Sequence, residues 1–134
     1  MNPASIVVDT NILVSGLLGN QGPPWQVVQA ITSGSVRPVV CAAIVAEYRA
    51  VLSRPRLRIR PDRVGELLQL IERTAEWVPV PAFTGAPTLP DPDDWPFFAA
   101  AQFSACPVIT GNVRHFPLGL GVRVMTAREW VEDA

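Results

Sequence analysis

Acidic side chains occur at three separated points of the sequence, each in otherwise apolar surroundings. Asp9 follows a β-branched run, Glu47 lies in an apolar helical pattern, and three carboxylates occur in the segment 91–94. A carboxylate in an apolar environment is costly unless a cation or hydrogen bonds compensate it, and Mg²⁺ and Mn²⁺ prefer oxygen ligands. The chain contains no lysine, which disfavours phosphoaspartate chemistry that needs one. The acids therefore predict a divalent-metal site.

Asp9 is positioned for ligand binding by the strand that precedes it. The apolar, β-branched run predicts a buried strand over Ile6–Asp9. Open α/β folds bind ligands at the carboxyl ends of their strands, so we expect the Asp9 carboxylate at this rim. Asn112 ends the fourth predicted strand, which brings its amide to the same rim if the sheet is parallel. Asn11 is expected to orient a ligand or the substrate, with ordinary loop chemistry as the alternative.

Glu47 shares a predicted helix face with apolar residues. Ile44, Glu47, Tyr48 and Val51 follow the i, i+3, i+4, i+7 spacing of one helix face. A charge on such a face needs a partner, and Arg49 falls nearly on the opposite side of the helix. We therefore expect a cation, or an arginine from elsewhere in the chain, to be that partner. The alternative is a structural salt bridge or an acid at the rim of the face.

The segment 91–94, Asp-Pro-Asp-Asp, precedes a predicted helix. Aspartate is a favoured helix cap and proline is tolerated in the first turn, so one of these acids is expected to cap. Three acids exceed what capping requires, and their mutual repulsion costs stability unless a cation or hydrogen bonds relieve it. We favour Asp94 as a metal ligand, interpret Asp91 as a turn residue and leave the role of Asp93 open.

The elements that position these residues alternate between strands and helices. Apolar periodicity, with Pro, Gly and Ser at the breaks, predicts strands over 6–9, 36–41, 77–80, 107–110 and 122–125, and helices over 12–18, 25–31, 42–53, from 61, over 94–104 and from 127. The third helix is expected to end near Arg54, because the residue before a proline leaves the helical region. This alternation implies an α/β fold with a mostly parallel sheet covered on both faces.

The composition fits a single domain over residues 1–134. A chain of 134 residues that is 49% hydrophobic and 17% charged suits one sizeable core. No apolar run approaches the ~18 residues of a membrane span, and the first residues lack the basic region of a signal peptide, so we expect a cytoplasmic protein without a membrane partner. Cys41 and Cys106 show no CxxC spacing and are interpreted as small core residues.

All eleven basic residues are arginine, and six of them crowd the stretch 49–63. The formal net charge of −1 gives no global basic field. Guanidinium groups bind phosphate in a bidentate manner, so this local patch is a candidate for tracking a nucleic-acid backbone, with a solvated helix end or a subunit contact as alternatives. Arg54, Arg56 and Arg114 are candidate substrate contacts. His115, the single histidine, is interpreted as a loop or rim residue, which disfavours a ribonuclease that needs two histidines.

Together these residues resemble the PIN-domain nucleases, in particular the toxin components of bacterial VapC-like toxin–antitoxin pairs. Four segments carry the resemblance in the family's order: VVDTNILVS at 7–15, EYRAVLSRPR at 47–56, DPDD at 91–94 before an alanine-rich helix, and ITGNVRHFP at 109–117. The resemblance covers nearly the whole chain. It implies a three-layer α/β/α sandwich around a parallel sheet, with Asp9, Glu47 and Asp94 as metal-binding acids. Asn112 takes the place where many PIN domains carry a fourth aspartate, which bears on whether a second ion binds.

The resemblance implies a Mg²⁺- or Mn²⁺-dependent endoribonuclease whose catalytic residues are Asp9, Glu47, Asp94 and Asn112. A divalent ion held by carboxylates activates a water and neutralises the phosphate under attack, so we expect hydrolysis of RNA phosphodiester bonds to 5′-phosphate and 3′-hydroxyl ends. This chemistry does not use the 2′-hydroxyl, and the preference for RNA rests on the resemblance. The implied partners are RNA, a cognate antitoxin protein and a second copy of the chain in a homodimer. The alternative is a catalytically weak PIN-like module that binds RNA or a protein.

Overall fold

One sheet of five parallel strands forms the centre of the molecule. The computed structural model describes residues 3–79, 89, 91–116 and 121–133. The strands are β1 (Ala4–Val8), β2 (Val36–Val40), β3 (Glu76–Trp77), β4 (Val108–Ile109) and β5 (Val124–Met125). They lie side by side in the order β3-β2-β1-β4-β5, and each neighbouring pair is parallel. The mostly parallel sheet predicted from the sequence is confirmed.

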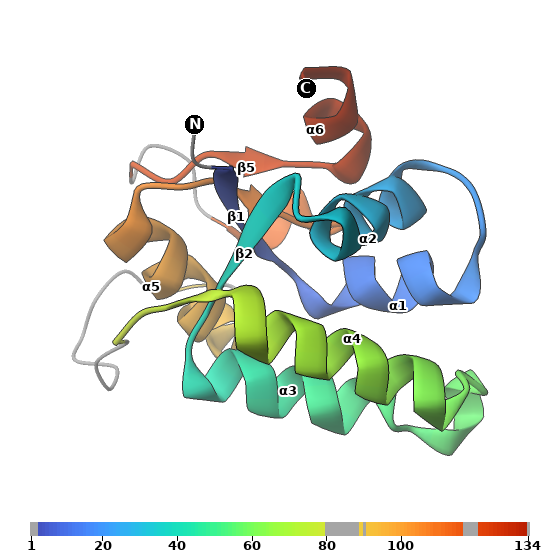
Figure 1. Cartoon of the computed structure of the whole chain (residues 1–134). Helices are drawn as coiled ribbons and strands as arrows, with labels where there is room; N and C mark the ends of the chain where they lie inside the picture. Colours follow the sequence, from blue (N-terminus) through green and yellow to red (C-terminus); the bar gives the residue numbers. More distant parts are fainter. Residues whose placement is uncertain (1–2, 80–88, 90, 117–120, 134) are drawn as a thin grey trace.

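Helices cover both faces of this sheet. They are α1 (Thr10–Leu18), α2 (Pro23–Ser33), α3 (Ala42–Leu52), α4 (Pro61–Thr74), α5 (Trp95–Ser104) and α6 (Ala127–Asp133), with short 3₁₀ turns η1 (Pro55–Leu57), η2 (Pro92–Asp94) and η3 (Val113–His115). Helix α5 contacts β1, β2 and β4, whereas α2 and α4 contact β2, and Figure 1 shows α5 and α2 on opposite sides of the two central strands. The fold is therefore a three-layer α/β/α sandwich, as expected.

The order of the strands places a topological switch point at the carboxyl ends of β1 and β4. The chain runs outward from β1 to β2 and β3, and then returns to β4 on the other side of β1. Right-handed crossovers place the helices of the outward and returning connections on opposite faces, so their ends diverge between β1 and β4. Open α/β sheets bind ligands at this kind of topological switch point. Asp9 comes directly after β1, and Thr110–Asn112 comes directly after β4.

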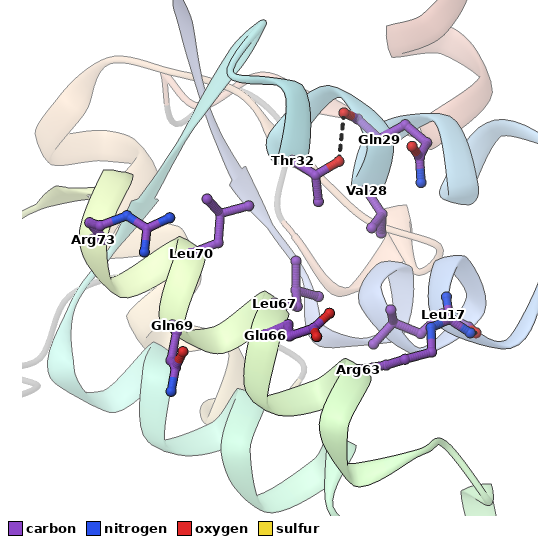
Figure 2. Close-up of a pocket in the computed structure, with 10 residues that line it drawn as sticks. All are labelled: Leu17, Val28, Gln29, Thr32, Arg63, Glu66, Leu67, Gln69, Leu70 and Arg73. Carbon is purple, nitrogen blue, oxygen red and sulfur yellow. Dashed lines mark hydrogen bonds between the residues drawn. The ribbon is translucent and has the colours of Figure 1, made fainter.

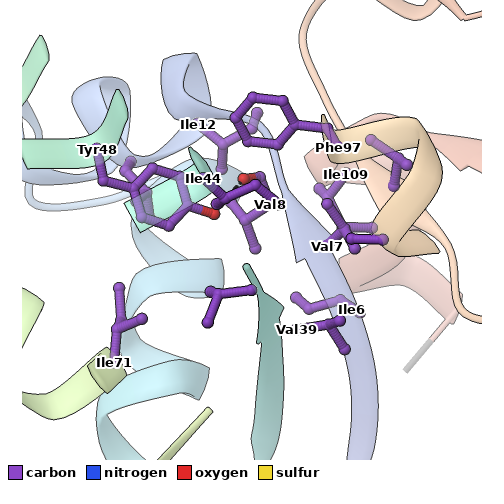
Figure 3. Packing of buried hydrophobic residues seen from close by; sticks show 14 of the residues in the cluster. Ile6, Val7, Val8, Ile12, Val39, Ile44, Tyr48, Ile71, Phe97 and Ile109 are labelled. Atoms are coloured by element: carbon purple, nitrogen blue, oxygen red, sulfur yellow. Dashed lines mark hydrogen bonds between the residues drawn. The ribbon is translucent and has the colours of Figure 1, made fainter. Parts of the chain in front are cut away.

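The core explains why the first strand is apolar at successive positions. Ile6, Val7 and Val8 are all buried, because layers of helices cover both faces of β1 (Figure 3). Tyr48 of α3 is buried beside Phe97 of α5, with ring centroids 6.2 Å apart. Its hydroxyl donates a hydrogen bond to the Val8 carbonyl oxygen. This bond ties α3 to the carboxyl end of β1, immediately before Asp9.

Most element boundaries follow the signals in the sequence, and a few differ. Arg54 has the extended conformation expected before a proline, so α3 ends there. The predicted strand over Ile6–Asp9 was wrong by one residue at its end, because Asp9 caps α1 and accepts a hydrogen bond from the Thr10 backbone N–H. The strand predicted over 77–80 begins one residue earlier, as β3, and residue 80 lies outside the described residues. No helix in the described ranges has the length and apolar character needed to cross a membrane.

Candidate metal centre

Asp9 is held at the end of β1 by contacts from two elements. Its backbone N–H continues the ladder to β4 by donating to the Ile109 carbonyl oxygen at 2.9 Å. One carboxylate oxygen accepts from the Thr10 backbone N–H at 2.8 Å, and the other accepts from the Thr110 hydroxyl at 2.7 Å. The residue is only 7% exposed. Burial raises the pKa of this carboxyl above its usual value, and the two hydrogen bonds offset part of that rise.

Glu47 reaches the same edge from α3. Its carboxylate is half-buried and accepts a hydrogen bond from the Thr10 hydroxyl. The sequence predicted a cation or an arginine as its partner; among the described residues its partner is a neutral hydroxyl and not an arginine, and the cation stays a prediction. Burial raises the pKa of the Glu47 carboxyl, and the negative charges of Asp9, Asp93 and Asp91 raise it further. The Thr10 hydroxyl leaves the negative charge uncompensated, so the need for a positive charge persists.

Within the segment 91–94, Asp91 and Asp94 have different structural roles. Asp91 caps η2, because its carboxylate accepts from the Asp93 backbone N–H at 3.0 Å. This confirms Asp91 as a turn residue. Asp94 directly precedes α5, but its side chain makes no capping hydrogen bond to that helix. Asp94 is 9% exposed, whereas Asp93 is exposed and its side chain makes no hydrogen bond or ion pair with a described residue. The buried carboxylate of this segment is therefore that of Asp94.

His115 lies beside Asp94, which the sequence did not predict. It ends the 3₁₀ turn η3 at the rim, and its Nδ1 atom is 3.2 Å from Oδ2 of Asp94. Asp91, Asp94 and His115 each offer a ligand atom, and these atoms all lie within 4.8 Å of one another. Among the described residues, this is the one group of three or more Asp, Glu, His or Cys side chains whose ligand atoms all lie within that distance of one another. It does not include Asp9 or Glu47.

The site thus has two halves whose charged groups interact with one another. The threonine half consists of Asp9 and Glu47 with the hydroxyls of Thr10 and Thr110, and the histidine half consists of Asp91, Asp94 and His115. Burial raises the pKa of Asp94 from 3.8 to about 6; the charges of Asp9 and Asp91 also raise it, and His115 lowers it. Because the charge of Asp9 acts on both Glu47 and Asp94, the two halves face one another across the edge.

The predicted polar residues at the rim are more exposed. Asn11 is half-buried, and its side-chain oxygen accepts from the Gly111 backbone N–H at 3.4 Å, a long contact that links the ends of β1 and β4. Asn112 and Arg114 are exposed. The Asn112 backbone N–H donates to the Thr110 hydroxyl at 2.9 Å. Thr110 therefore links Asn112 to Asp9, and the Asn112 side-chain amide makes no hydrogen bond within the described part of the chain.

Arg54 and Arg56 lie away from the acids, at the far end of α3. Seven residues separate Glu47 from Arg54, which corresponds to about 10 Å along a helix. Both arginines are exposed, as is Arg58, and none of the three makes an ion pair with a residue in the described part of the chain. Elsewhere in the stretch, Arg60 pairs with Asp62 at 2.7 Å. Within the patch, Arg54, Arg56 and Arg58 therefore have no ion pair among the described residues, whereas Arg49 and Arg60 pair with Glu72 and Asp62.

A separate hollow of about 440 Å³ lies between α1, α2 and α4 (Figure 2). Its lining mixes polar and apolar side chains, and Arg63 on its rim donates to the Leu17 carbonyl oxygen at 3.1 Å. No residue of the threonine or histidine half lines this hollow. The chemistry-bearing side chains are instead gathered at the carboxyl edge of the sheet.

A family comparison covers most of the chain. The model of the PIN domain matches residues 5–114 of the chain. The chain belongs to the PIN-domain family. Proteins of this family are generally nucleases and typically use divalent metal ions. A comparison with curated proteins gives no significant match.

The residues of this PIN domain fit a divalent ion. The donors at the edge are carboxylate oxygens, with threonine hydroxyls and one imidazole beside them. Oxygen donors of this kind suit Mg²⁺ and Mn²⁺. Burial raises the pKa of Asp9, Glu47 and Asp94, and neighbouring negative charges raise each of them further. A cation bound at this edge would stabilise the ionised forms of these carboxyl groups.

The sequence missed the groups that support the acids in this PIN domain. Thr10 and Thr110 are 5% and 0% exposed, so each is a buried hydroxyl next to a strand end. Their signal is a polar residue directly after an apolar run, in Val8-Asp9-Thr10 and Ile109-Thr110. His115 lies only five residues beyond Thr110. A short turn after β4 keeps His115 at the edge. Its small sequence separation from Thr110 was the signal that could have predicted this position.

Proposed function

We propose that this PIN domain is a Mg²⁺- or Mn²⁺-dependent endoribonuclease and the toxin component of a VapC-like toxin–antitoxin pair. The observation that carries the proposal is the gathering of three carboxyl groups, Asp9, Glu47 and Asp94, from three elements at the switch-point edge. The pKa of each is raised first by burial and also by negative neighbours. Such an arrangement costs stability in a protein that does not use it to bind a cation.

Asp9, Glu47 and Asp94 are the residues that would hold the ion. When bound, a divalent ion supplies positive charge to that phosphate and lowers the pKa of a water. Thr110 and Thr10 hold the carboxylates of Asp9 and Glu47 in fixed directions through their hydroxyls. The threonine half is therefore a preorganised set of oxygen ligands. Holding these groups in place before the substrate binds reduces the cost of ordering them in the transition state.

Polar and basic side chains beyond the acids bind the substrate. Asn11 and Asn112 lie next to the acids and support the water or the substrate phosphate. Arg114 lies in the turn η3, one residue before His115. Arg54 and Arg56 extend the contact along α3, where unpaired guanidinium groups attract a phosphate backbone. Asp93 remains exposed beside the edge, and it contributes negative charge rather than a ligand.

The toxin assignment rests on the order of the four segments that resemble VapC-like proteins. Under this assignment, a short reading frame beside the gene encodes a protein that inhibits the nuclease, and the nuclease forms a homodimer. Co-expression of that neighbour is expected to abolish the growth arrest caused by the nuclease alone. If no neighbouring protein inhibits it, the toxin assignment fails while the nuclease assignment remains.

The test of the nuclease is cleavage of a mixed set of structured and single-stranded RNAs. We expect cleavage with Mg²⁺ or Mn²⁺, none with EDTA, and none with Asp9→Asn. Glu66→Gln, an exposed acid on α4 away from the edge, is the matched control and should cleave normally. RNA binding without metal-dependent cleavage by the folded wild type would instead favour the alternative, a catalytically weak PIN-like binding module.

A further inference from the structure

His115 is the residue of the edge that the proposed function leaves unused. It is the single histidine of the chain, it belongs to a turn of three residues, and its side chain is 41% exposed. The family match ends at residue 114, so the match says nothing about this position. The contacts of His115 indicate its role.

The contact between His115 and Asp94 has the spacing of neighbouring metal ligands. Nδ1 of His115 is 3.2 Å from Oδ2 of Asp94, and both lie within 4.8 Å of a carboxylate oxygen of Asp91. Two adjacent ligands of an octahedral ion with bonds near 2.1 Å are about 3 Å apart. The Asp91 carboxylate is also fixed, because it accepts from the Asp93 backbone N–H. The trio is therefore held by two short turns, η2 and η3.

A simple ion pair accounts for only part of this arrangement. A protonated His115 neutralises at most one negative charge, whereas Asp91 and Asp94 supply two, and Asp9 adds a third to the same field. A divalent ion bonded to the imidazole brings two positive charges to the place where the acids converge.

Resting on the cation site of the proposed function, we propose that His115 is a nitrogen ligand of that ion, and that it makes the site prefer a first-row transition-metal ion such as Mn²⁺ to Mg²⁺. Mg²⁺ takes an almost exclusively oxygen environment and keeps several waters. Imidazole nitrogen binds transition-metal ions more readily, and it therefore adds affinity for Mn²⁺ without adding comparable affinity for Mg²⁺.

The single histidine makes a direct spectroscopic test possible. Pulsed EPR of Mn²⁺ added to the protein, prepared without a polyhistidine tag, detects a ¹⁴N nucleus bonded directly to the metal. We expect this ¹⁴N coupling in the wild type and its loss in His115→Ala. Val113→Ala, in the same turn and equally accessible to solvent, is the matched control and should keep it. Circular dichroism of each variant verifies that it is folded.

Affinities measured by calorimetry test the preference itself. His115→Ala should weaken Mn²⁺ binding about 10-fold and change Mg²⁺ binding far less. His115→Asp, which restores an oxygen ligand, should move the preference back toward Mg²⁺. Equal losses of Mn²⁺ and Mg²⁺ affinity in His115→Ala, or no loss of either, would overturn the proposal.

The outcomes separate this inference from the proposed function. If Mn²⁺ binds and RNA is cleaved, but the wild type shows no directly bonded ¹⁴N, the role of His115 is wrong and the nuclease stands. If the folded wild type binds Mg²⁺ but no Mn²⁺, the role of His115 is wrong and the nuclease stands. If it binds neither ion, both proposals are wrong.

Discussion

In both halves of the acidic edge, carboxyl groups with a raised pKa contact a polar side chain, but the kind of side chain differs between the halves. In the threonine half, neutral hydroxyls donate to Asp9 and Glu47. In the histidine half, Asp94 lies against an imidazole that gains a positive charge when protonated. A hydroxyl orients a carboxylate without neutralising it, whereas a protonated imidazole does both. The threonine half therefore relies on a bound cation to compensate its ionised carboxylates, whereas Asp94 of the histidine half also has an imidazole beside it.

This difference predicts that the two halves respond unequally to mutation. The acids of the threonine half are fixed by buried bonds, and Asp9 is the most enclosed of them. The histidine half lies in short turns at the rim and is partly exposed. We expect catalysis to be most sensitive in the first half and metal choice and pH response to be set in the second.

The largest expected effect is the contrast between Asp9→Asn and Asp91→Asn. Asp9→Asn removes a carboxylate ligand and should lower kcat/KM for RNA cleavage by at least about 100-fold. Asp91→Asn keeps the oxygen that caps η2 and should cost less than about 10-fold. Steady-state cleavage of one RNA by both variants measures the contrast. Equal losses would mean that the halves are catalytically equivalent.

Thr110→Val is expected to have the next largest effect. The hydroxyl of Thr110 donates to Asp9 at 2.7 Å and accepts from the Asn112 backbone N–H at 2.9 Å. Removing it leaves a buried acceptor and a donor unsatisfied, which should lower the free energy of unfolding by about 1–3 kcal/mol. Thr10→Val, which loses the hydrogen bond to the half-buried Glu47, should cost less. Urea denaturation of both variants measures the order, and a larger loss for Thr10→Val would contradict it.

The pH dependence of stability distinguishes the histidine half. The pKa of Asp94 is raised from 3.8 to about 6 in the folded protein, chiefly by burial and then by Asp9 and Asp91. Between these pH values the folded state binds more protons than the unfolded state, so the free energy of unfolding falls as pH rises from about 4 to about 6. Asp94→Asn removes this share, on the order of 1 kcal/mol.

Urea denaturation in EDTA at several pH values tests this prediction. The stability of Asp94→Asn relative to the wild type should rise across the pH window 4–6. His115 also faces Asp94, so the measurement is repeated in His115→Ala. A difference between Asp94→Asn and wild type that stays constant across the window, in both backgrounds, would show that Asp94 titrates normally.

The smallest expected effect concerns the arginines beyond the edge. Reversing the charge of Arg54 and Arg56 together should weaken RNA binding several-fold at low salt and reduce the salt dependence of binding. Cleavage at saturating RNA should change little, because neither residue contacts the acids. Arg73→Glu with Arg128→Glu, two exposed arginines outside this segment, is the matched control. Unchanged RNA affinity in the Arg54 and Arg56 variant would remove these residues from the substrate surface.

The sequence predicted what depends on pattern and missed what depends on contact. The apolar run before Asp9 and the alternation of elements were enough to predict the parallel sheet and the edge at which Asp9 lies. The spacing of Glu47 on its helix also predicted the face that it presents. Whether Asp9, Glu47 and Asp94 bind an ion together remains a prediction.

The partners of the acids could not be predicted in the same way. Thr10 contacts Glu47 across 37 positions, and Thr110 contacts Asp9 across 101 positions. No periodicity in one sequence reveals such pairs, because strand order and crossover bring them together. The position of His115 next to Asp94 likewise depends on how two short turns meet. Side-chain contacts of this kind follow from the fold rather than from local spacing.

The most direct test of the account is a crystal structure of the wild type grown with Mn²⁺, in which anomalous scattering locates the ion. The account predicts a peak at the carboxyl edge of the sheet, with oxygens of Asp9 and Asp94 at bonding distances of about 2.1–2.3 Å. A peak absent from this edge, in crystals of protein shown to bind Mn²⁺ in solution, would contradict the assignment of these acids as the metal centre.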